Sequence, residues 1–471
     1  MIETIVAGDD LLLQILQVQR HAFLRDGAPT LEQRRSDLKK FKAALIARKE
    51  DIEKAINADF GHRSKHETDV VEILGVVEGI KYLYKNLRKF MRPQDRHVAM
   101  HMKLGKAHVE YQPLGVVGVI SPWNYPINLS LMPVVTAIAA GNRVMLKPSK
   151  FTPATNAVIE AMFKAIFPAD QVTLVNGDGA AFSKLPFDHL VFTGSTSVGR
   201  SVMKAASENL VPVTLELGGK SPVIMGKGYS FEKAASRIVY GKLLSAGQTC
   251  IAPDYVLVHE AEVETFVNAY DREVKKAYPD GPTGEDYTSI INDKQYEILQ
   301  DLLDDAKKLG AKIIEIGVKP EDASKRPHTM APKIVLGVTD EMKIAHEEIF
   351  GPILPVLPYR SVEGAINYVN HRPRPLALYY FGKDNNEKRK VLNSTTSGNV
   401  TVNGTFSHIA QDDLPFGGVG DSGMGQYHGI EGFRTLSHAK GIYEQGIWNG
   451  MDMLHAPFGK LTDRLIRFFL K

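Results

Sequence analysis

Residues 189–199 read HLVFTGSTSVG: a short apolar run is followed at once by a glycine-bearing turn and then by a helical stretch. Four similar runs lie around it in the chain, namely VVGVI (116–120), RVML (143–146), VTLV (172–175) and VTLEL (213–217). Such runs, separated by about 20 residues of helical pattern, are typical of buried parallel strands with crossover helices. The sequence therefore predicts a doubly wound, Rossmann-type α/β domain whose ligands bind beyond the carboxyl ends of the strands.

A second alternating series begins after Gly218 and predicts a second α/β domain. Its apolar runs are PVIM (222–225), YVLV (255–258), KIIEI (312–316), KIVLGV (333–338), ILPVL (353–357), LALYYF (376–381) and NVTVN (399–403). Further on, six glycines fall within PFGGVGDSGMGQYHG (415–429). That density indicates a backbone that packs tightly against something or turns repeatedly.

Two helical regions are expected outside these series. Thr30 and Gln33 form a capping-box pattern, and apolar residues then recur at helical spacing until Gly61, which predicts one surface helix with a buried stripe. The stripe consists of Leu38, Phe41, Leu45, Ile52 and Ile56. The most apolar long window, 127–146, contains too many polar residues and a proline for a membrane span, so we expect a buried helix there.

The composition favours a small-molecule partner in the cytoplasm. The 471 residues are 44% hydrophobic and 24% charged, as in ordinary globular proteins of two or three domains. A formal net charge of +3 gives no reason to expect nucleic acid. A single cysteine excludes an internal disulfide framework and fits a reducing compartment, and the N-terminal residues lack the pattern of a signal peptide. No metal-ligand spacing appears, so no catalytic metal is expected.

Two segments favour a dinucleotide. The turn around Gly194 and Gly199 would let amides at a helix N-terminus approach a pyrophosphate, although the spacing is not GxGxxG and an ordinary turn is an equal alternative. Lys147 follows the run RVML and could reach a ribose or a phosphate, although strand-end lysines are more often solvated. Lys150 adds a positive charge that would tolerate the 2′-phosphate of NADP.

Three residues are candidates for chemistry. Asn124 lies in the proline-bounded loop SPWNYP (121–126), where its amide could donate to an oxyanion or could cap the next helix. Glu216 ends an apolar run, where burial would raise its pKa toward that of a general base unless it pairs with Lys220 or a backbone amide. Cys250 lies in the turn SAGQTC (245–250), which suits a reactive thiol better than an inert core cysteine.

The segment EEIFGP (347–352) also has two interpretations. It could be the end of a helix before a turn. Alternatively, Glu348 could accept hydrogen bonds from a ribose while Phe350 packs near a nicotinamide.

Eight segments occur together in one order: PWNYP, KPS, FTGSTSVG, LELGGK, GQTC, EEIFGP, NVTVNG and PFGGVGDSGMG. This set closely resembles the aldehyde dehydrogenase superfamily from about residue 111 to about residue 438. The run PFGGVGDSGMGQYHGIEGF and the upstream DFGHRSKHET (59–68) resemble the class 3 branch, and within it bacterial coniferyl aldehyde dehydrogenase most nearly.

The resemblance implies a role for each site residue. Cys250 would be the nucleophile, Glu216 the general base and Asn124 the oxyanion donor, while Tyr125 and Thr249 would line the substrate pocket. The residues expected at the NAD or NADP cofactor are Ser121, Trp123, Lys147, Ser149, Lys150, Gly194, Ser195, Val198, Gly199, Leu217, Gly218, Glu348 and Phe350. Many relatives have an acidic residue where this chain has Lys150, which puts a strict preference for NAD in doubt.

The resemblance also implies the domains. Residues 1–97 and 113–217 would bind the cofactor, 218–405 would form the catalytic domain, and 98–112 with 406–450 would bridge to a second copy in a homodimer. Residues 451–471 form an amphipathic tail in which Leu461, Leu465, Phe468 and Phe469 suit one helix face, with Arg464, Arg467 and Lys471 nearby. The tail could meet a membrane surface, but packing within the dimer is the preferred interpretation.

The expected reaction oxidises an aldehyde to its carboxylate through a thioester on Cys250, with coniferyl aldehyde as the best candidate and a medium or long-chain fatty aldehyde as the alternative. An acylating enzyme that transfers the acyl group to coenzyme A or phosphate is a rival, against which Glu216 argues. A non-catalytic structural protein on the same fold would be expected to lack the nucleophile or the base, and this sequence has both.

Overall fold

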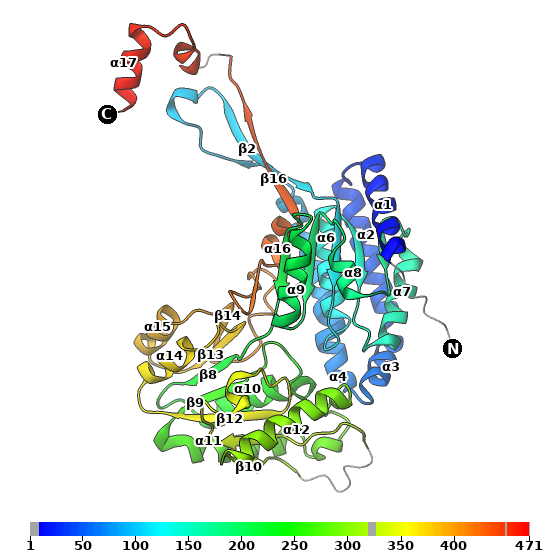
Figure 1. Ribbon diagram of the computed structural model, residues 1–471, viewed down its shortest axis with the longest axis vertical. Coiled ribbons are helices and arrows are strands. Elements are labelled where there is room, and N and C mark those ends of the chain that lie inside the picture. Colours follow the sequence, from blue (N-terminus) through cyan, green and yellow to red (C-terminus); the bar gives the residue numbers. More distant parts are fainter. Residues whose placement is uncertain (1–8, 319–325, 448–449, 471) are drawn as a thin grey trace.

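The computed structural model describes residues 9–318, 326–447 and 450–470. Its first sheet has six strands in the order β15-β7-β6-β3-β4-β5, all parallel except β15 (Figure 1). The strands are β3 (Val116–Ile120), β4 (Arg143–Lys147), β5 (Val172–Leu174), β6 (His189–Thr193), β7 (Val213–Glu216) and β15 (Gly423–Met424). The five predicted strands are confirmed, and β15 was not predicted.

Helices cover both faces of this sheet, as in a doubly wound fold. On one face, α6 (Asn128–Ala140) and α7 (Pro153–Ile166) pack on the strands. The helices α2 (Leu31–Ala47), α3 (Lys49–Phe60) and α5 (Gly75–Phe90) pack against α6 and α7 from outside. The other face carries α1 (Asp9–Asp26), α8 (Gly179–Ser183) and α9 (Thr196–Ser207). Apolar side chains fill both interfaces, so the strands are buried on both sides, which explains their continuous apolar runs.

The second sheet has seven strands in the order β10-β11-β12-β9-β8-β13-β14, with only β10 antiparallel to its neighbour. Its strands are β8 (Pro222–Met225), β9 (Tyr255–His259), β10 (Lys312–Glu315), β11 (Lys333–Leu336), β12 (Ile353–Tyr359), β13 (Ala377–Phe381) and β14 (Asn399–Val402). Its helices are α10 (Phe231–Leu243), α11 (Val263–Ala277), α12 (Asp293–Lys308), α13 (Lys343–His346), α14 (Val362–Asn370) and α15 (Asn385–Ser394). The second predicted series is confirmed run by run.

The single N-terminal helix that the apolar stripe predicted is wrong. The capping box at Thr30 is present, but the helix ends at Ala47 and α3 starts at Lys49, because Arg48 leaves helical geometry with φ −104° and ψ 15°. All five stripe residues are nevertheless buried, and the change of direction lets α3 pack along α7. Gly61 ends α3 in the left-handed conformation.

The apolar window 127–146 is only partly helical. The buried helix α6 occupies its first part, and after Gly141 turns in the left-handed conformation the chain enters strand β4. The helix expected there is therefore confirmed over 128–140 and wrong beyond it. Within the described residues, no helix is long and apolar enough to cross a membrane.

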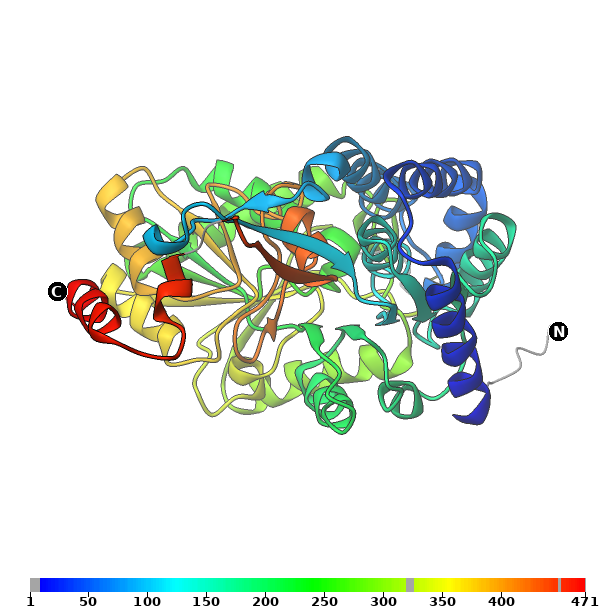
Figure 2. The same cartoon turned by 90° about the horizontal axis from the view of Figure 1, so that it is seen from above.

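A three-stranded antiparallel sheet projects from the body (Figures 1 and 2). It comprises β1 (Gln94–Asp95), β2 (Lys106–Pro113) and β16 (Ser437–Glu444). Helix α16 (Gly429–Thr435) precedes it on the body, and α17 (Lys460–Phe469) lies beyond its far end. On α17, Leu461 and Phe468 are exposed and Leu465 is half-buried, while Lys471 lies outside the described residues.

Candidate active site

The two sheets contribute to the candidate site from opposite edges. Asn124 and Gly194 follow β3 and β6, and Glu216 is the last residue of β7, so all three lie at the carboxyl edge of the first sheet. Cys250 and Glu348 instead lie before β9 and β12, at the amino edge of the second sheet. The rule that functional residues follow the strands therefore holds for the first sheet only.

Cys250 lies at the end of an unusually constrained turn. Ser245, Ala246 and Gly247 all have positive φ, at 52°, 50° and 79°. The buried side chain of Gln248 closes the turn, because its Nε2 donates to the carbonyl of Ser245 (2.9 Å) and its Oε1 accepts from a backbone amide. Left-handed backbone at non-glycine residues costs free energy and persists only where surrounding contacts fix it.

The Cys250 thiol is surrounded by groups that control its ionisation. Burial raises its pKa, and the carboxylates of Glu348 and Glu216 raise it further, whereas the amides of Cys250 and Ile251 lower it. The side chain is still partly exposed, which fits a thiol that a small molecule can reach.

Asn124 faces the cysteine turn and does not cap a helix. Its buried Nδ2 donates to the carbonyl of Gln248 at 3.0 Å, while α6 begins later and has Ile127 at its N-cap. The helix-cap interpretation is therefore wrong. Since an amide nitrogen carries two N–H groups, one remains for an oxyanion beside Cys250.

Glu216 is buried and has no hydrogen-bond partner at either carboxylate oxygen. Burial raises its pKa well above the usual range. Lys220 does not pair with it, because the Lys220 ammonium forms its ion pair with Asp254. The structural pairing considered from the sequence is therefore wrong, and an uncompensated buried carboxyl group of this kind is typical of functional sites.

The glycine-rich run packs backbone against backbone beside Glu216. Gly423 pairs with Glu216 in the β15–β7 ladder, and a Cβ at Gly423 would lie 2.1 Å from the carbonyl of Leu215. A Cβ at Gly418 would lie 1.9 Å from the carbonyl of Ser422. Both predicted reasons for these glycines hold, because the backbone packs tightly here and four of the six glycines have positive φ.

The N-terminus of α9 lies where a pyrophosphate was predicted. Ser195 is its N-cap and makes no side-chain cap bond, so the amides of the first turn are left for a ligand. Gly199 is buried and its missing Cβ would lie 2.6 Å from a methyl group of Leu217, so this glycine lets the helix approach β7. Val198 is exposed next to it.

Gly218, in the segment that joins β7 of the first sheet to β8 of the second, lies against the Glu348 carboxylate. A Cβ at Gly218 would lie 1.9 Å from Glu348 Oε2, so only glycine leaves room for this carboxylate. Burial and Asp254 raise the pKa of Glu348 to about 8, against the lowering effect of the Gly219 amide. An acceptor in such a setting fits a ribose hydroxyl.

Phe350 and Trp123 meet edge to face at 5.4 Å between ring centroids, although they come from different sheets. Phe350 has a positive φ of 54°, which marks it as held in place by its surroundings. The two rings form the apolar wall at the junction that a nicotinamide would need.

The polar residues at the carboxyl ends of β3 and β4 differ in how free their side chains are to contact a cofactor. Lys147 is half-buried, and burial lowers its pKa while Asp178 raises it, so it is not the freely solvated lysine considered above. Lys150 is exposed. The hydroxyl of Ser121 bonds to Ser130 Oγ at 2.6 Å and Ser149 Oγ accepts from a backbone amide, so both are engaged within the protein.

Tyr125 and Thr249 are buried and bond to each other, Oη to Oγ1, at 2.7 Å. The structure thus brings together the two pocket residues that the sequence suggested, but their polar atoms are occupied. Aromatic residues that the sequence reasoning missed also lie near the thiol: Tyr379 donates to the carbonyl of Ile251 at 2.6 Å, and Cys250 and Glu216 raise the pKa of Tyr427, after burial.

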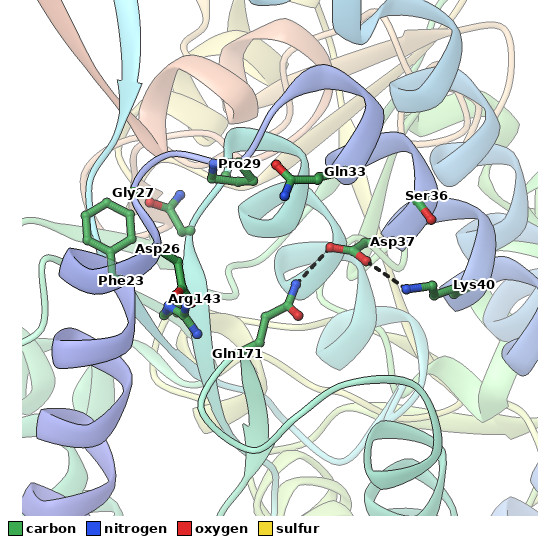
Figure 3. Close-up of a pocket in the computed structure, with 12 residues that line it drawn as sticks. Phe23, Asp26, Gly27, Pro29, Gln33, Ser36, Asp37, Lys40, Arg143 and Gln171 are labelled. Carbon is green, nitrogen blue, oxygen red and sulfur yellow. Dashed lines mark hydrogen bonds and ion pairs between the residues drawn. The ribbon is translucent and has the colours of Figure 1, made fainter.

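A cavity of about 300 Å³ lies away from Cys250, Glu216 and Asn124 (Figure 3). It lies between α1, α2 and the amino end of β4, and Gln171 donates to Asp37 across it at 2.8 Å. Arg143, at its wall, is paired with Asp26. Because it opens at the edge of the sheet opposite Glu216, it is not part of the candidate site.

Comparison with known proteins now identifies the family. The model of the aldehyde dehydrogenase family matches residues 13–442. The chain belongs to the aldehyde dehydrogenase family. It is an NAD(P)-dependent aldehyde dehydrogenase, and the superfamily resemblance is confirmed.

Relatives also confirm the predicted branch. The chain is 49% identical to a probable coniferyl aldehyde dehydrogenase of Pseudomonas aeruginosa, over 95% of this chain and 94% of the relative. It is 45% identical to the coniferyl aldehyde dehydrogenase of a Pseudomonas species, over 98% and 97%. It is 36% identical to aldehyde dehydrogenase family 3 member A2 of Mus musculus, over 92% and 88%.

Solved structures confirm the fold. A substrate-bound AldH of Staphylococcus aureus matches with a TM-score of 0.91 and 36% identity, covering 97% of this chain and 99% of that one. A betaine aldehyde dehydrogenase of the same organism, solved with NAD+, matches at 0.84 and 25% identity, over 94% and 89%. The roles of individual site residues remain predictions.

The raised pKa of Cys250 gives a first prediction. With only one cysteine in the chain, iodoacetamide reports on this thiol alone. We expect its alkylation rate to keep rising above pH 9, where an ordinary thiol has levelled off. Glu348→Gln should speed alkylation several-fold at pH 8, because removal of a nearby negative charge favours the thiolate.

Alkylation is followed by mass spectrometry, with the exposed neighbour variant Glu347→Gln as control. A rate that levels off below pH 8, or equal rates in the two variants, would contradict the electrostatic account of this thiol.

Proposed function

We propose that this enzyme oxidises an aldehyde to the free carboxylate through a thioester on Cys250 that water hydrolyses. The observation that carries the proposal is the convergence of a partly exposed thiol, a free amide N–H and an unpaired buried carboxyl group. In the first step the Cys250 thiolate attacks the aldehyde carbon, and a C–S bond forms as the carbonyl oxygen becomes an oxyanion.

The oxyanion is stabilised by the Asn124 amide and by the backbone amide of Cys250, whose hydrogen bonding lowers the pKa of the thiol. Bound NAD(P) supplies the acceptor for the hydride that leaves the same carbon. The residues that would hold the cofactor are the first turn of α9, Glu348, Lys147 and the rings of Trp123 and Phe350.

Glu216 completes the cycle as the base for hydrolysis. Its unpaired carboxylate removes a proton from water, the water oxygen attacks the thioester carbon, and the C–S bond breaks to release the acid and the thiol. A base reserved for water argues against the acylating alternative, in which coenzyme A or phosphate would accept the acyl group. The presence of both nucleophile and base argues against a non-catalytic structural protein.

The proposed substrate is coniferyl aldehyde, converted to ferulate. The names of relatives at 45–49% identity support this choice. The aromatic residues beside the thiol, Tyr379 and Tyr427, also suit a planar aromatic aldehyde. A medium or long-chain fatty aldehyde is the alternative.

The proposal includes cytoplasmic location and a homodimer. The projecting sheet leaves an edge of β16 without a neighbouring strand among the described residues, and an edge of this kind is suited to pairing with another chain. Exposed apolar side chains lie near the free end of this sheet, including Met100, Leu104 and Ile447. A second copy would cover them.

Glu216→Gln provides the first test of the reaction scheme. We expect a burst of reduced nicotinamide followed by a steady-state rate about 100-fold lower, because the thioester forms but is not hydrolysed. In the parent enzyme the steady rate should rise with pH, since the raised pKa keeps Glu216 protonated at lower pH, and the variant should lose this dependence. Stopped-flow absorbance measures both phases.

Cys250→Ala is the control and should reduce no nicotinamide while still binding it. Fast turnover without a burst in Glu216→Gln would remove Glu216 from the role of base, and turnover by Cys250→Ala would exclude the thioester.

Substrate and cofactor are tested together. We expect a higher kcat/KM for coniferyl aldehyde than for a medium-chain alkanal, with activity on both NAD and NADP. Lys150→Glu should raise the KM for NADP about tenfold relative to NAD, because a carboxylate repels the 2′-phosphate. Lys164→Glu, at another exposed lysine, is the charge-matched control. Preference for the alkanal would favour the fatty-aldehyde alternative.

Sedimentation tests the assembly. We expect a particle of twice the mass of one chain and no pelleting with vesicles of phosphatidylcholine and phosphatidylglycerol. A monomer would contradict the proposed dimer, and pelleting that is lost on removal of residues 451–471 would assign α17 to a membrane surface.

A further inference from the structure

We propose that Arg63, in the loop after α3, and Glu67 and Glu72, in the helical segment before α5, form a positioning unit that fixes Asn124 opposite Cys250. The inference rests on the proposed function, because it assigns a purpose to the geometry of those two residues. None of the three was a candidate from the sequence, although Arg63 and Glu67 lie in the motif DFGHRSKHET. Each reaches one of the two catalytic loops from outside the site.

Glu67 holds the cysteine turn. Both of its carboxylate oxygens accept from the amide of Ser245 at 3.1 Å, and Oε2 also accepts from Thr288 Oγ1 at 2.6 Å. Ser245 is the first of the three residues with positive φ. The carboxylate therefore satisfies a backbone donor that the strained turn would otherwise leave buried and unpaired.

Glu72 holds the start of the helix that follows Asn124. Its Oε2 accepts from the amides of Ile127 and Asn128 at 3.0 and 2.7 Å, so a side chain from another element fills the role of an N-cap. The N-cap residue itself, Ile127, makes no side-chain cap bond. The orientation of the Asn124 loop is therefore set by Glu72.

Arg63 connects Glu72 to Asn124. Its Nη1 donates to the carbonyl of Asn124 at 2.5 Å, and its guanidinium lies 4.8 Å from the ring centroid of Tyr125. Its Nη2 faces Glu72 Oε1 at 3.6 Å, and both side chains are completely buried. Arg63 thus binds the backbone carbonyl of Asn124, while the side-chain amide of Asn124 faces the cysteine turn.

The helix that carries Glu67 and Glu72 is distorted in a way that turns both residues toward the same side of its axis. Thr68–Leu74 is π-helical, between the α-helical turn Lys65–Glu67 and α5. In a regular α-helix, residues five apart such as Glu67 and Glu72 lie about 140° apart around the axis. The wider π turn brings them closer to one face, and π segments of this kind often occur at functional sites.

Stability alone does not explain the unit. Arg63 Nε and Nη2 and Glu72 Oε1 have no hydrogen-bond partner, and burial raises the pKa of Glu72 to about 7 against the attraction of Arg63. A buried ion pair with unfilled hydrogen-bonding capacity is a weak source of stability. Each of the three residues nevertheless contacts the cysteine turn, Asn124 or the start of α6, and positioning of the two loops accounts for these contacts.

The geometry predicts that substitutions of these residues affect the cysteine turn and the Asn124 loop separately. Alkylation of Cys250 by iodoacetamide is a displacement at carbon that develops no oxyanion, whereas attack on an aldehyde does. Glu67→Gln should therefore change the alkylation rate at pH 8 at least threefold. Arg63→Lys and Glu72→Gln should leave that rate within twofold but slow the burst of reduced nicotinamide by about 10-fold to 100-fold, with KM for NAD(P) within twofold.

A double-mutant cycle separates positioning from general damage. Arg63→Lys should slow the burst 10-fold or more in the parent enzyme but less than threefold in Asn124→Ala, because the amide it positions is gone. Equal losses in both backgrounds would overturn the proposal. Arg34→Lys is the matched control: Arg34 is also buried and donates to the carbonyls of Pro29 and Ala139, away from the site, and its variant should change stability without slowing the burst.

Folding and function are checked independently. If Arg63→Lys does not fold, as shown by circular dichroism and thermal unfolding, the isosteric Glu72→Gln takes its place in the cycle. If no aldehyde reduces nicotinamide even in the parent enzyme, the proposed function fails, while the response of Cys250 alkylation to Glu67→Gln still decides the Glu67 part of the unit. Unchanged alkylation in a folded Glu67→Gln variant would overturn that part.

Discussion

The left-handed turn Ser245–Gly247 is the constraint on which the site depends. Non-glycine residues in this conformation cost of order 1–3 kcal/mol each, so the turn exists only because neighbouring groups fix it. Gln248 closes it from within, and the backbone of Gly351 packs so near that a Cβ at Gly247 would lie 2.4 Å from the Gly351 carbonyl. The turn thereby places Cys250 at the amino edge of the second sheet, where it faces the carboxyl edge of the first sheet.

The buried carboxyl groups of the site have different environments. Glu67 and Glu72 accept backbone amides, whereas Glu216 accepts nothing and Glu348 lies against Gly218. Glu67 and Glu72 can hold structure because each accepts hydrogen bonds from the backbone of a loop at the site. The unpartnered group is the one left free to exchange a proton with water, which is the chemistry that hydrolysis requires.

Much of the fold could be predicted from the sequence, because strands buried on both faces leave continuous apolar runs. The helix break at Arg48 could not, since the stripe keeps its spacing across the bend and only the packing of α3 on α7 requires it. Cys250, Glu216 and Asn124 could be proposed because a turn, an apolar strand end and a rigid loop are local signals. Arg63 and Glu72 act across 61 and 55 residues, and no local pattern predicts such contacts.

The hydrogen bond from Asn124 to Gln248 couples the proposed nucleophile, Cys250, to the proposed oxyanion donor, Asn124. One N–H of the amide is fixed by a carbonyl that lies two residues before Cys250, so the direction of the other N–H is set by the same turn that carries the thiol. The backbone carbonyl of Asn124 is in turn fixed by a hydrogen bond from Arg63. A shift of the cysteine turn would therefore rotate the Asn124 amide with it, and Asn124 and Cys250 keep their relative geometry even though different sheets supply them.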